Sequence, residues 1–332
     1  MPKATYQKRG SSTVDMDGLF ASTLDYRKDD IVDQIFVKKP ALAYMLERKQ
    51  TQCINDAEQF LIPMEHERNP NGGMIDEEEG ISMDDFDPDT MAIYSAKTAA
   101  YGVRFGRKQK RVNAGKSKIY SLIDHKIKNT QKSLRDTLSS QLWTGSGTGK
   151  QANGLTRLIP ATAKASQSVS IGGLSPSTYA WWRTQATNMA NMAAATYLEE
   201  EMLSMYNIIE DETGAPDVIF CDRATQEIYE NNAKEFVRVD ARKIANVTFT
   251  MTHYKDMPII RDKEAPVGEL RMITNDQISF EVDPDYWFEW TGWKEIPNLP
   301  FTTVKQVVCV FQMCRSAARG LGCIYNISVD GS

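Results

Sequence analysis

The chain has 332 residues, of which 41% are hydrophobic and 25% are charged, and its formal net charge is -5. This composition is that of a folded soluble protein, and the acidic balance argues against a dedicated nucleic-acid binder, whose surface is usually basic. No apolar run reaches the roughly 20 residues that a membrane-spanning helix needs, and residues 1–10 are polar and basic without a following apolar core. We therefore expect a protein that is made in a cytoplasm and stays there.

The N-terminal region predicts an arm followed by a short helix. Residues 1 to about 30 are polar, with scattered apolar positions and no sustained period. Ile31 to Lys49 is a helix candidate, because its apolar residues recur at helical spacing, and Pro40 is expected to interrupt it.

Residues Gln59 to Phe105 predict a long β-hairpin. Phe60 to Pro63 supplies one strand, Asn69 to Gly73 is dense in turn residues, and a single returning strand is expected from Ala92 to Phe105. The hairpin carries too little apolar sequence to bury its own core. Since a two-stranded ribbon is marginal alone, we expect it to lie on another surface.

Lys116 to Trp143 predicts one amphipathic helix on the order of 40 Å long. Its apolar stripe has three- and four-residue spacing and consists of Ile119, Leu122, Ile123, Ile127, Leu134, Leu138 and Leu142. The opposite face is basic and carries Lys116, Lys128, Lys132 and Arg135. Such a face is either simply solvated or meets a defined partner.

The glycine-rich segment after this helix resembles a phosphate-binding loop only superficially. That motif needs a glycine five positions before Gly149-Lys150 and a hydroxyl residue directly after the lysine, but Thr144 and Gln151 stand there. The glycines also close a long helix, with Gly145 placed as its C-cap, whereas phosphate-binding glycines open one. We therefore interpret the segment as a helix-terminating loop.

The rest of the chain alternates between strands and helices, which gives an α+β fold. The expected strands are 155–160, 218–221, 258–260, 270–274 and 304–313, and the expected helices are 197–211 and 223–231. Asp222 is the predicted N-cap of the second helix. Val304 to Met313 is almost continuously apolar, as is typical of a strand covered on both faces.

The sequence predicts no catalytic residue, no cofactor-binding residue and no metal ligand. The three histidines form no recognisable constellation, and no G-x-S-x-G motif occurs. Asp85, Asp87 and Asp89 match the start of a calcium loop, but Thr90 replaces the required glycine and Ala96 the bidentate glutamate. The five cysteines are odd in number and form no C-x-x-C pair. Cys309, Cys314 and Cys323 lie in or beside an apolar run, so we expect these three to be buried free thiols.

Charge is distributed unevenly around the predicted hairpin. An acidic run lies in the hairpin, and a basic run follows its end. We expect the acidic ribbon of one subunit to pair with the basic segment of a neighbour, because opposite charges across an interface favour association. The candidate inter-subunit residues are Asp76, Glu77, Glu78, Glu79, Asp84 and Asp85 on the acidic side and Arg107, Lys108, Lys110 and Arg111 on the basic side.

The order of these elements resembles the major capsid proteins of tailed double-stranded DNA bacteriophages, whose fold also occurs in encapsulin shells. The local similarities are the helix-to-glycine turn at 142–155, Asp217 to Asp222, Met257 to Ile260, and Phe311 to Ile327 with Arg315. The resemblance implies an N-terminal arm and short helix at 1–50, an extended β-hairpin loop at 51–112, a peripheral domain with the long spine helix at 113–173 and 294–332, and an apical domain at 174–293.

The resemblance implies a structural role without enzymatic activity. Subunits would self-assemble as hexamers and pentamers into an icosahedral shell that encloses phage double-stranded DNA without sequence-specific contacts. The expected partners are further copies of the chain, a separate scaffolding protein and a portal; decoration proteins are left open. The protein would be located in the virion capsid, after assembly in the host cytoplasm, without contact to a membrane. Two alternatives remain: an encapsulin-type nanocompartment shell and a cytosolic phosphate-binding enzyme.

The sequence departs from part of the resembled family at the hairpin. Some members join a lysine of this loop covalently to an asparagine of a neighbour, but this chain has no lysine between Lys49 and Lys97. We therefore predict a shell without such cross-links. The extended region also begins close to Met1, so a separate scaffolding protein is expected in place of a fused scaffolding segment.

Overall fold

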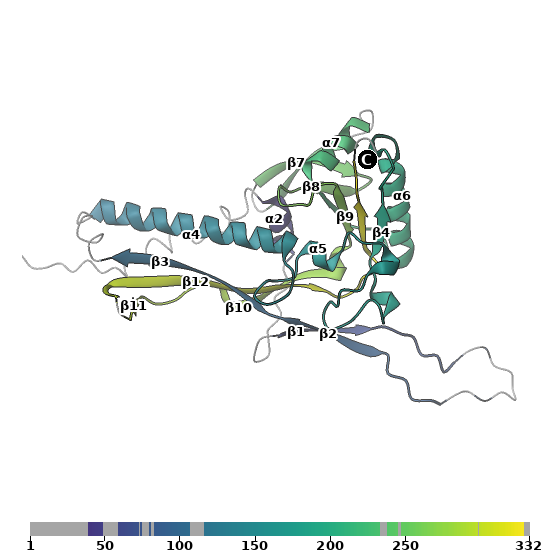
Figure 1. Cartoon of the computed structure of the whole chain (residues 1–332), viewed down its shortest axis with the longest axis horizontal. Coiled ribbons are helices and arrows are strands. Elements are labelled where there is room, and N and C mark those ends of the chain that lie inside the picture. Colours follow the sequence, from purple (N-terminus) through teal and green to yellow (C-terminus); the bar gives the residue numbers. More distant parts are fainter. Residues whose placement is uncertain are drawn as a thin grey trace, which may run out of the picture.

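The computed structural model describes residues 39–48, 59–72, 74, 80, 83–106, 116–232, 238–244, 247–297 and 299–328, with backbone alone for 116–125, 238–244, 247–251 and 300. The fold is α+β, as predicted, and the molecule is elongated (Figure 1). A long helix and long strands run along the body, a larger sheet with its helices forms the apical part, and a hairpin projects from the body.

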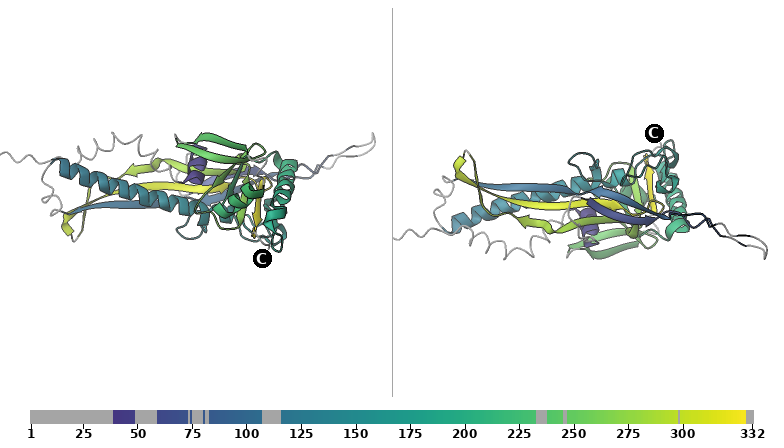
Figure 2. Two further views of the ribbon diagram at one scale, coloured as in Figure 1. Left: turned by 90° about the horizontal axis from the view of Figure 1, so that it is seen from above. Right: turned by 90° about the horizontal axis from the view of Figure 1, so that it is seen from below.

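The long body combines one helix with a four-stranded sheet. Helix α4 (Lys116–Thr144) packs along strand β3 (Lys97–Gly106), and Figure 2 shows that the two run side by side. Strand β12 (Leu299–Arg315) is central, because it pairs antiparallel with β3, β10 (Ile278–Trp290) and β11 (Lys294–Ile296). Ile127, Leu134, Leu138 and Leu142 of the predicted apolar stripe are buried, which confirms four of its seven positions. The side chains of Ile119, Leu122 and Ile123 lie outside the described residues.

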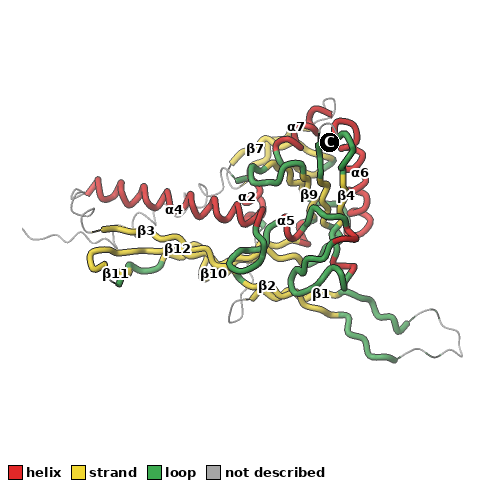
Figure 3. The backbone as a smooth tube through the Cα atoms, viewed as in Figure 1, coloured by secondary structure: helices red, strands yellow, loops and turns green. Residues whose placement is uncertain are grey.

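The projecting hairpin is shorter than the sequence predicts. Strand β1 (Gln59–Glu65) pairs antiparallel with β2 (Asp89–Ser95), and beyond them two loop segments leave the body (Figure 3). The expected single returning strand from Ala92 to Phe105 is wrong, because the chain breaks at Ala96 and continues as β3 in the other sheet. Pairing with β12 decides this, since β3 matches it from Phe311 to Thr302.

The glycine segment forms a compact turn between α4 and a short helix. The Gly145 N–H donates to the Gln141 carbonyl at 3.1 Å, so Gly145 ends α4 as predicted. The expected strand at 155–160 is wrong: Leu155–Leu158 is helix α5, because Gly154 accepts the first helical hydrogen bonds from Arg157 and Leu158. Lys150 is exposed in this loop.

The apical part is a mixed sheet of seven strands. Their order is β4 (Gln185–Asn188), β13 (Leu321–Tyr325), β9 (Glu269–Ile273), β5 (Val218–Cys221), β8 (Met257–Arg261), β7 (Val247–Tyr254) and β6 (Arg238–Ile244). Helices α6 (Ala194–Thr213) and α7 (Arg223–Asn232) are the predicted helices at 197–211 and 223–231. Asp222 caps α7 as predicted, accepting a hydrogen bond from the Ala224 N–H at 2.9 Å. Short 3₁₀ helices lie at Lys164–Ser166, Ala180–Trp182 and Asn275–Gln277.

Strand β5 shows why the sheet is so apolar. Val218 and Phe220 belong to the large core that the sheet shares with the body, whereas Ile219 and Cys221 pack in the core beneath α6. Because both faces are covered, every residue of this strand is buried. The large core also contains Leu138 of α4, so the body and the apical sheet are packed together.

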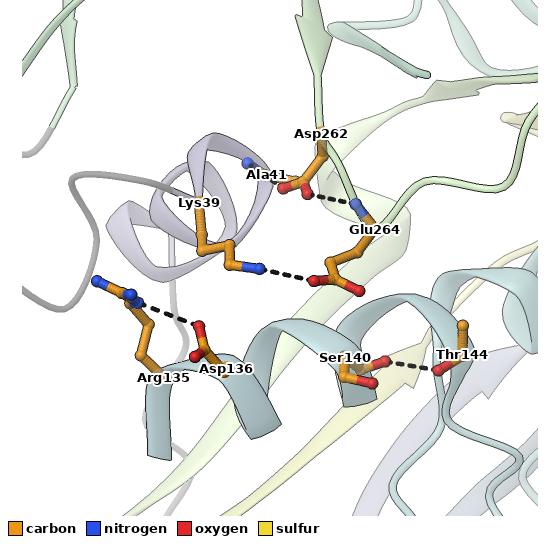
Figure 4. A network of polar contacts seen from close by, with 8 residues as sticks. All are labelled: Lys39, Ala41, Arg135, Asp136, Ser140, Thr144, Asp262 and Glu264. Atoms are coloured by element: carbon orange, nitrogen blue, oxygen red, sulfur yellow. Dashed lines mark hydrogen bonds and ion pairs between the residues drawn. The ribbon is translucent and has the colours of Figure 1, made fainter. Parts of the chain in front are cut away.

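Helix α2 (Pro40–Glu47) links the body to the apical sheet. Ala41 to Leu46 are all buried. Pro40 lies in the first turn of α2, where its missing N–H needs no partner, and Lys39 before it is not helical. Residues 31–38 lie outside the described residues, so the prediction that Pro40 interrupts a longer helix stays a prediction. Asp262 accepts a hydrogen bond from the Ala41 N–H at 3.3 Å, and Lys39 pairs with Glu264 at 2.7 Å (Figure 4). Burial raises the pKa of Asp262.

Candidate assembly surfaces

The hairpin is fixed to the body at its root by Tyr94 of β2. The Tyr94 hydroxyl donates a hydrogen bond to the Arg315 carbonyl at 2.7 Å and accepts one from the Arg315 backbone N–H at 3.2 Å. Tyr94 is buried, and this burial raises its pKa, so the hydroxyl remains a donor throughout the neutral range. The end of the central strand β12 therefore holds the base of the hairpin.

The Arg315 side chain extends this connection into the core. Its guanidinium donates to the Leu158 carbonyl at 2.6 Å and to the Trp182 carbonyl at 2.9 Å, and it lies 4.3 Å from the centre of the Trp182 ring. Burial lowers the pKa of Arg315 to about 10, which still leaves it cationic at neutral pH. Two carbonyl groups and one aromatic ring thus surround the guanidinium charge. Through these contacts Arg315 joins the hairpin root to α5 and to the 3₁₀ helix Ala180–Trp182.

Gly172 also contacts the hairpin root. Its carbonyl accepts a hydrogen bond from the Ile93 N–H at 3.0 Å. Its φ is +61°, and an added Cβ would lie 2.8 Å from the Ala92 Cβ and 2.9 Å from the Tyr94 ring. Only glycine satisfies both the left-handed backbone and this close approach.

The outer face of the hairpin is apolar and exposed. Phe60, Ile62, Ala92 and Tyr94 point inward and are buried. Their neighbours along the strands form an outer row in which Leu61 faces Ile93 and Pro63 faces Met91. Leu61 is 46% exposed, and Met91 and Ile93 are each 47% exposed. A contiguous apolar patch of this kind is typical of an interaction surface. We call these four residues, Leu61, Pro63, Met91 and Ile93, the outer hairpin face.

The sequence prediction of inter-subunit contacts did not include the outer hairpin face. The signal was present, because Phe60 to Pro63 and Met91 to Tyr94 are unbroken apolar runs, whereas a half-solvated strand alternates apolar with polar residues. Continuous apolar runs in a projecting ribbon indicate that both of its faces become covered. One face is covered within the chain, and the other is left exposed.

The predicted charged residues are only partly described. Asp84 and Asp85 are exposed in the segment that leads into β2, and the Asn71 side-chain amide donates a hydrogen bond to the Asp84 carbonyl. The other eight lie outside the described residues: Asp76, Glu77, Glu78, Glu79, Arg107, Lys108, Lys110 and Arg111. The predicted pairing between these two groups therefore stays a prediction.

Within the described ranges, no group of histidine, cysteine, aspartate and glutamate side chains is arranged to hold a metal ion. Asp85 and Asp87 are exposed, and Asp87 accepts a hydrogen bond from the Asp89 N–H at 3.3 Å, as in a turn that leads into a strand. In the same part of the chain, no helix is long and apolar enough to cross a membrane.

Solved structures of shell proteins match this architecture along almost its whole length. The capsid asymmetric unit of cyanophage A-1(L) matches with a TM-score of 0.63 at 14% identity, covering 88% of this chain and 93% of the other. The fold is that of tailed-phage capsid proteins. The capsid of a native GTA particle matches with a TM-score of 0.58 at 9% identity, covering 86% and 91% of the two chains.

An encapsulin shares this capsid fold as well. The SrpI encapsulin from Synechococcus elongatus PCC 7942 matches with a TM-score of 0.55 at 10% identity, covering 86% of this chain and 88% of the other. No protein-family model matches the chain, and no curated protein matches it. The likeness is therefore one of fold, with the sequences far apart.

Proposed function

We propose that this chain is a major capsid protein that self-assembles, through hexamers and pentamers, into an icosahedral shell around phage double-stranded DNA. The observation that carries this proposal is the outer hairpin face, an exposed apolar surface on a projecting element of a capsid fold. Such a surface is unfavourable in water and becomes buried when a second copy covers it.

The outer hairpin face supplies the apolar part of the subunit contact. Leu61, Met91 and Ile93 are each about half exposed, so covering the remainder contributes roughly 1 kcal/mol per side chain. Contacts of this size are weak singly, and they add up over the many copies of a closed shell. The anchored root of the hairpin limits how far this face moves, which reduces the entropy lost on docking.

The acidic run of the hairpin supplies the charged part of the proposed contact, by meeting the basic segment of a neighbour. Replacing Arg107, Lys108, Lys110 and Arg111 by glutamate should then block shell formation while the monomer stays folded. A control reverses the exposed Lys150, which lies outside both charged runs. Normal shells from the fourfold variant would contradict the pairing.

Further parts of this proposal concern what the shell contains and what it assembles with. DNA packed at high density needs no specific base contacts, and the net charge of -5 gives no reason to expect them. A separate scaffolding protein and a portal are the proposed partners during assembly in the host cytoplasm, and the virion is the final location. We propose a structural role without enzymatic turnover.

The assembled shell should lack covalent cross-links through the hairpin. No lysine stands between Lys49 and Lys97, so the nucleophile for such a link is missing from the hairpin strands and their loop. Assembled shells boiled in SDS should therefore give a single band at the 37.4 kDa monomer. A ladder of higher bands would contradict this.

An encapsulin-type nanocompartment is the second candidate, because the SrpI encapsulin has the same fold. The two functions differ in content, since one shell holds DNA and the other holds a cargo enzyme. Portal and terminase genes beside the coding sequence support the phage capsid, and a neighbouring cargo enzyme supports the compartment.

Sedimentation velocity tests the shared part of both functions. The purified protein should form particles that sediment far faster than a 37.4 kDa monomer. Leu61→Glu should shift the protein to the monomer position, because a charge on the outer hairpin face opposes its burial. A wild-type protein that stays monomeric with its scaffolding partner present would overturn the proposal.

A further inference from the structure

Helix α6 carries an unusual combination of charge and exposed apolar surface. Its buried face consists of Ala194, Leu198, Met202, Met205 and Ile209, which pack in the core beneath the apical sheet. Its outer face exposes Tyr197, Leu203 and Ile208, each between 40% and 44%. The helix has no basic residue, and its acidic residues are Glu199, Glu200, Glu201, Glu210, Asp211 and Glu212.

The position of these acids disfavours the helix itself. Glu210, Asp211 and Glu212 lie in the last turn before Gly214, where the helix dipole is negative. A carboxylate at the C-terminal end of a helix destabilises that helix. Arg319 pairs with Glu212 at 3.2 Å, but this exposed pair offsets little of that cost. Local stability therefore does not explain the acidic outer face, which indicates a role outside the monomer.

A basic element stands at the far end of the same sheet. The strand order ends at β6, which is hydrogen-bonded to β7, and the sequence of β6 is Arg-Val-Asp-Ala-Arg-Lys-Ile. Arg238, Arg242 and Lys243 outnumber the single acid Asp240. In Figure 1, α6 runs along one flank of the apical part, while β7, the neighbour of β6, lies on the other flank. Among the described residues, β6 is the last strand of this sheet, and an edge strand offers its backbone groups to a partner.

We propose that the α6 face of one copy docks on the β6 edge of the next copy within a ring. The two surfaces differ and lie on opposite flanks, so the contact is head-to-tail, and such contacts close into rings when the rotation between subunits fits. The inference rests on the proposed capsid function and names the surfaces that join subunits within one hexamer or pentamer. Tyr197, Leu203 and Ile208 supply apolar contacts, and Glu200 and Asp211, which lie between them around the outer face of the helix, supply charges that fix the orientation.

Charge reversal with compensation tests this contact. Glu200→Lys with Asp211→Lys reverses the α6 face, and Arg238→Glu with Arg242→Glu reverses the β6 edge. Each double variant should lower the yield of shells at least tenfold, measured by sedimentation at equal protein concentration. The fourfold variant, in which both surfaces are reversed, should recover assembly. Glu200→Gln with Asp211→Asn is the matched neutral control, and its yield should lie between wild type and the reversed variant.

The monomer provides a second readout that separates folding from assembly. Asp211→Lys replaces an acid by a base at the negative end of α6, so thermal unfolding of the reversed α6 monomer should occur at the same temperature as wild type or higher. A merely structural role of these acids predicts a less stable monomer instead. Circular dichroism on the dissociated subunits measures this.

Mixing the two reversed variants gives a test of ring closure. The variants complement each other only when they alternate around a ring, and alternation closes a ring of six but leaves one repulsive contact in a ring of five. The mixture should therefore recover hexamers and yield few closed shells. Wild-type yields of shells from both double variants would overturn the inference, and so would a folded fourfold variant that fails to assemble. Neither result would contradict the proposed function. A wild-type chain that forms no particles would overturn the proposed function first.

Discussion

Tyr94 and Arg315 lie 221 positions apart and exchange two hydrogen bonds, one from the tyrosine hydroxyl to the Arg315 carbonyl and one from the Arg315 N–H back to the hydroxyl. The Tyr94 hydroxyl thereby pairs with both the N–H and the carbonyl of Arg315, which is the last residue of β12. Because Tyr94 belongs to the hairpin and Arg315 to the long sheet, this contact sets where the hairpin leaves the body.

Tyr94→Phe should destabilise the monomer by about 1–3 kcal/mol, because it leaves a buried carbonyl and N–H of Arg315 without their partner. Urea unfolding measures the change. Tyr286→Phe is the matched control, since Tyr286 is half exposed and its loss should change stability by less than about 0.5 kcal/mol. Equal stability of the two variants would show that the hydroxyl does not hold the hairpin root.

Gly172→Ala should cost more than Gly173→Ala. Both glycines have positive φ, so both substitutions carry a backbone cost of about 1–2 kcal/mol. Only Gly172 lies against the hairpin, whereas an added Cβ at Gly173 meets nothing within 4 Å. The difference in the free energy of unfolding between the two variants isolates the close approach to Ala92 and Tyr94. Identical values would mean that the hairpin root tolerates a methyl group there.

The buried thiols should make the fold sensitive to alkaline pH. Burial raises the pKa of Cys323 to about 11 and that of Cys309 to about 12, and it also raises the pKa values of Cys221 and Cys314. Unfolded thiols ionise near about pH 8.5, so the unfolded chain holds fewer protons above that pH and stability falls. Each thiol removes about 1.4 kcal/mol per pH unit until its native pKa is reached.

The measurement is urea unfolding at pH 7.5 and pH 9.5 in a Cys53→Ser background, which removes the cysteine outside the described residues. The midpoint should drop at the higher pH, and Cys309→Ala should make the drop smaller. A thiol reagent should react with the remaining cysteines only after unfolding. Rapid reaction of the native protein would contradict their burial.

Leu61→Ser with Ile93→Ser should abolish assembly and leave the monomer folded. Both side chains are about half exposed, so the monomer loses little, whereas the proposed contact loses its apolar centre. Val267→Ser is the matched control, because Val267 is an exposed apolar residue of the apical part, away from the hairpin. The measurement is the yield of shells by sedimentation. An unchanged yield would show that the outer hairpin face is not part of the assembly contact.

The parts of the fold that the sequence predicted are those with a strong local period. Helix α6 shows Leu198, Met202, Met205 and Ile209 on one face, and that face is buried. Strand β5 and its Asp222 cap follow from a short apolar run and a capping residue. In these elements the local pattern and the tertiary packing agree.

The incorrect predictions arise where tertiary packing, and not the local sequence pattern, determines the structure. No breaker residue separates β2 from β3, so only pairing with β12 reveals that Lys97 starts a strand of another sheet. Helix α5 has four residues, which is too short to show a helical period. In the candidate assembly surfaces, the acidic and basic runs can be recognised from the sequence. The exposure of Leu61 and Ile93 cannot, because it depends on which face of the hairpin the body covers.

Cryo-electron microscopy of the purified, assembled protein tests the proposed function most directly. The reconstruction should show closed icosahedral particles built of hexamers and pentamers, with Leu61, Pro63, Met91 and Ile93 of each copy buried against a neighbour. Monomers under assembly conditions would contradict the proposed function, and closed particles in which these four residues remain solvent-exposed would contradict the role of the outer hairpin face.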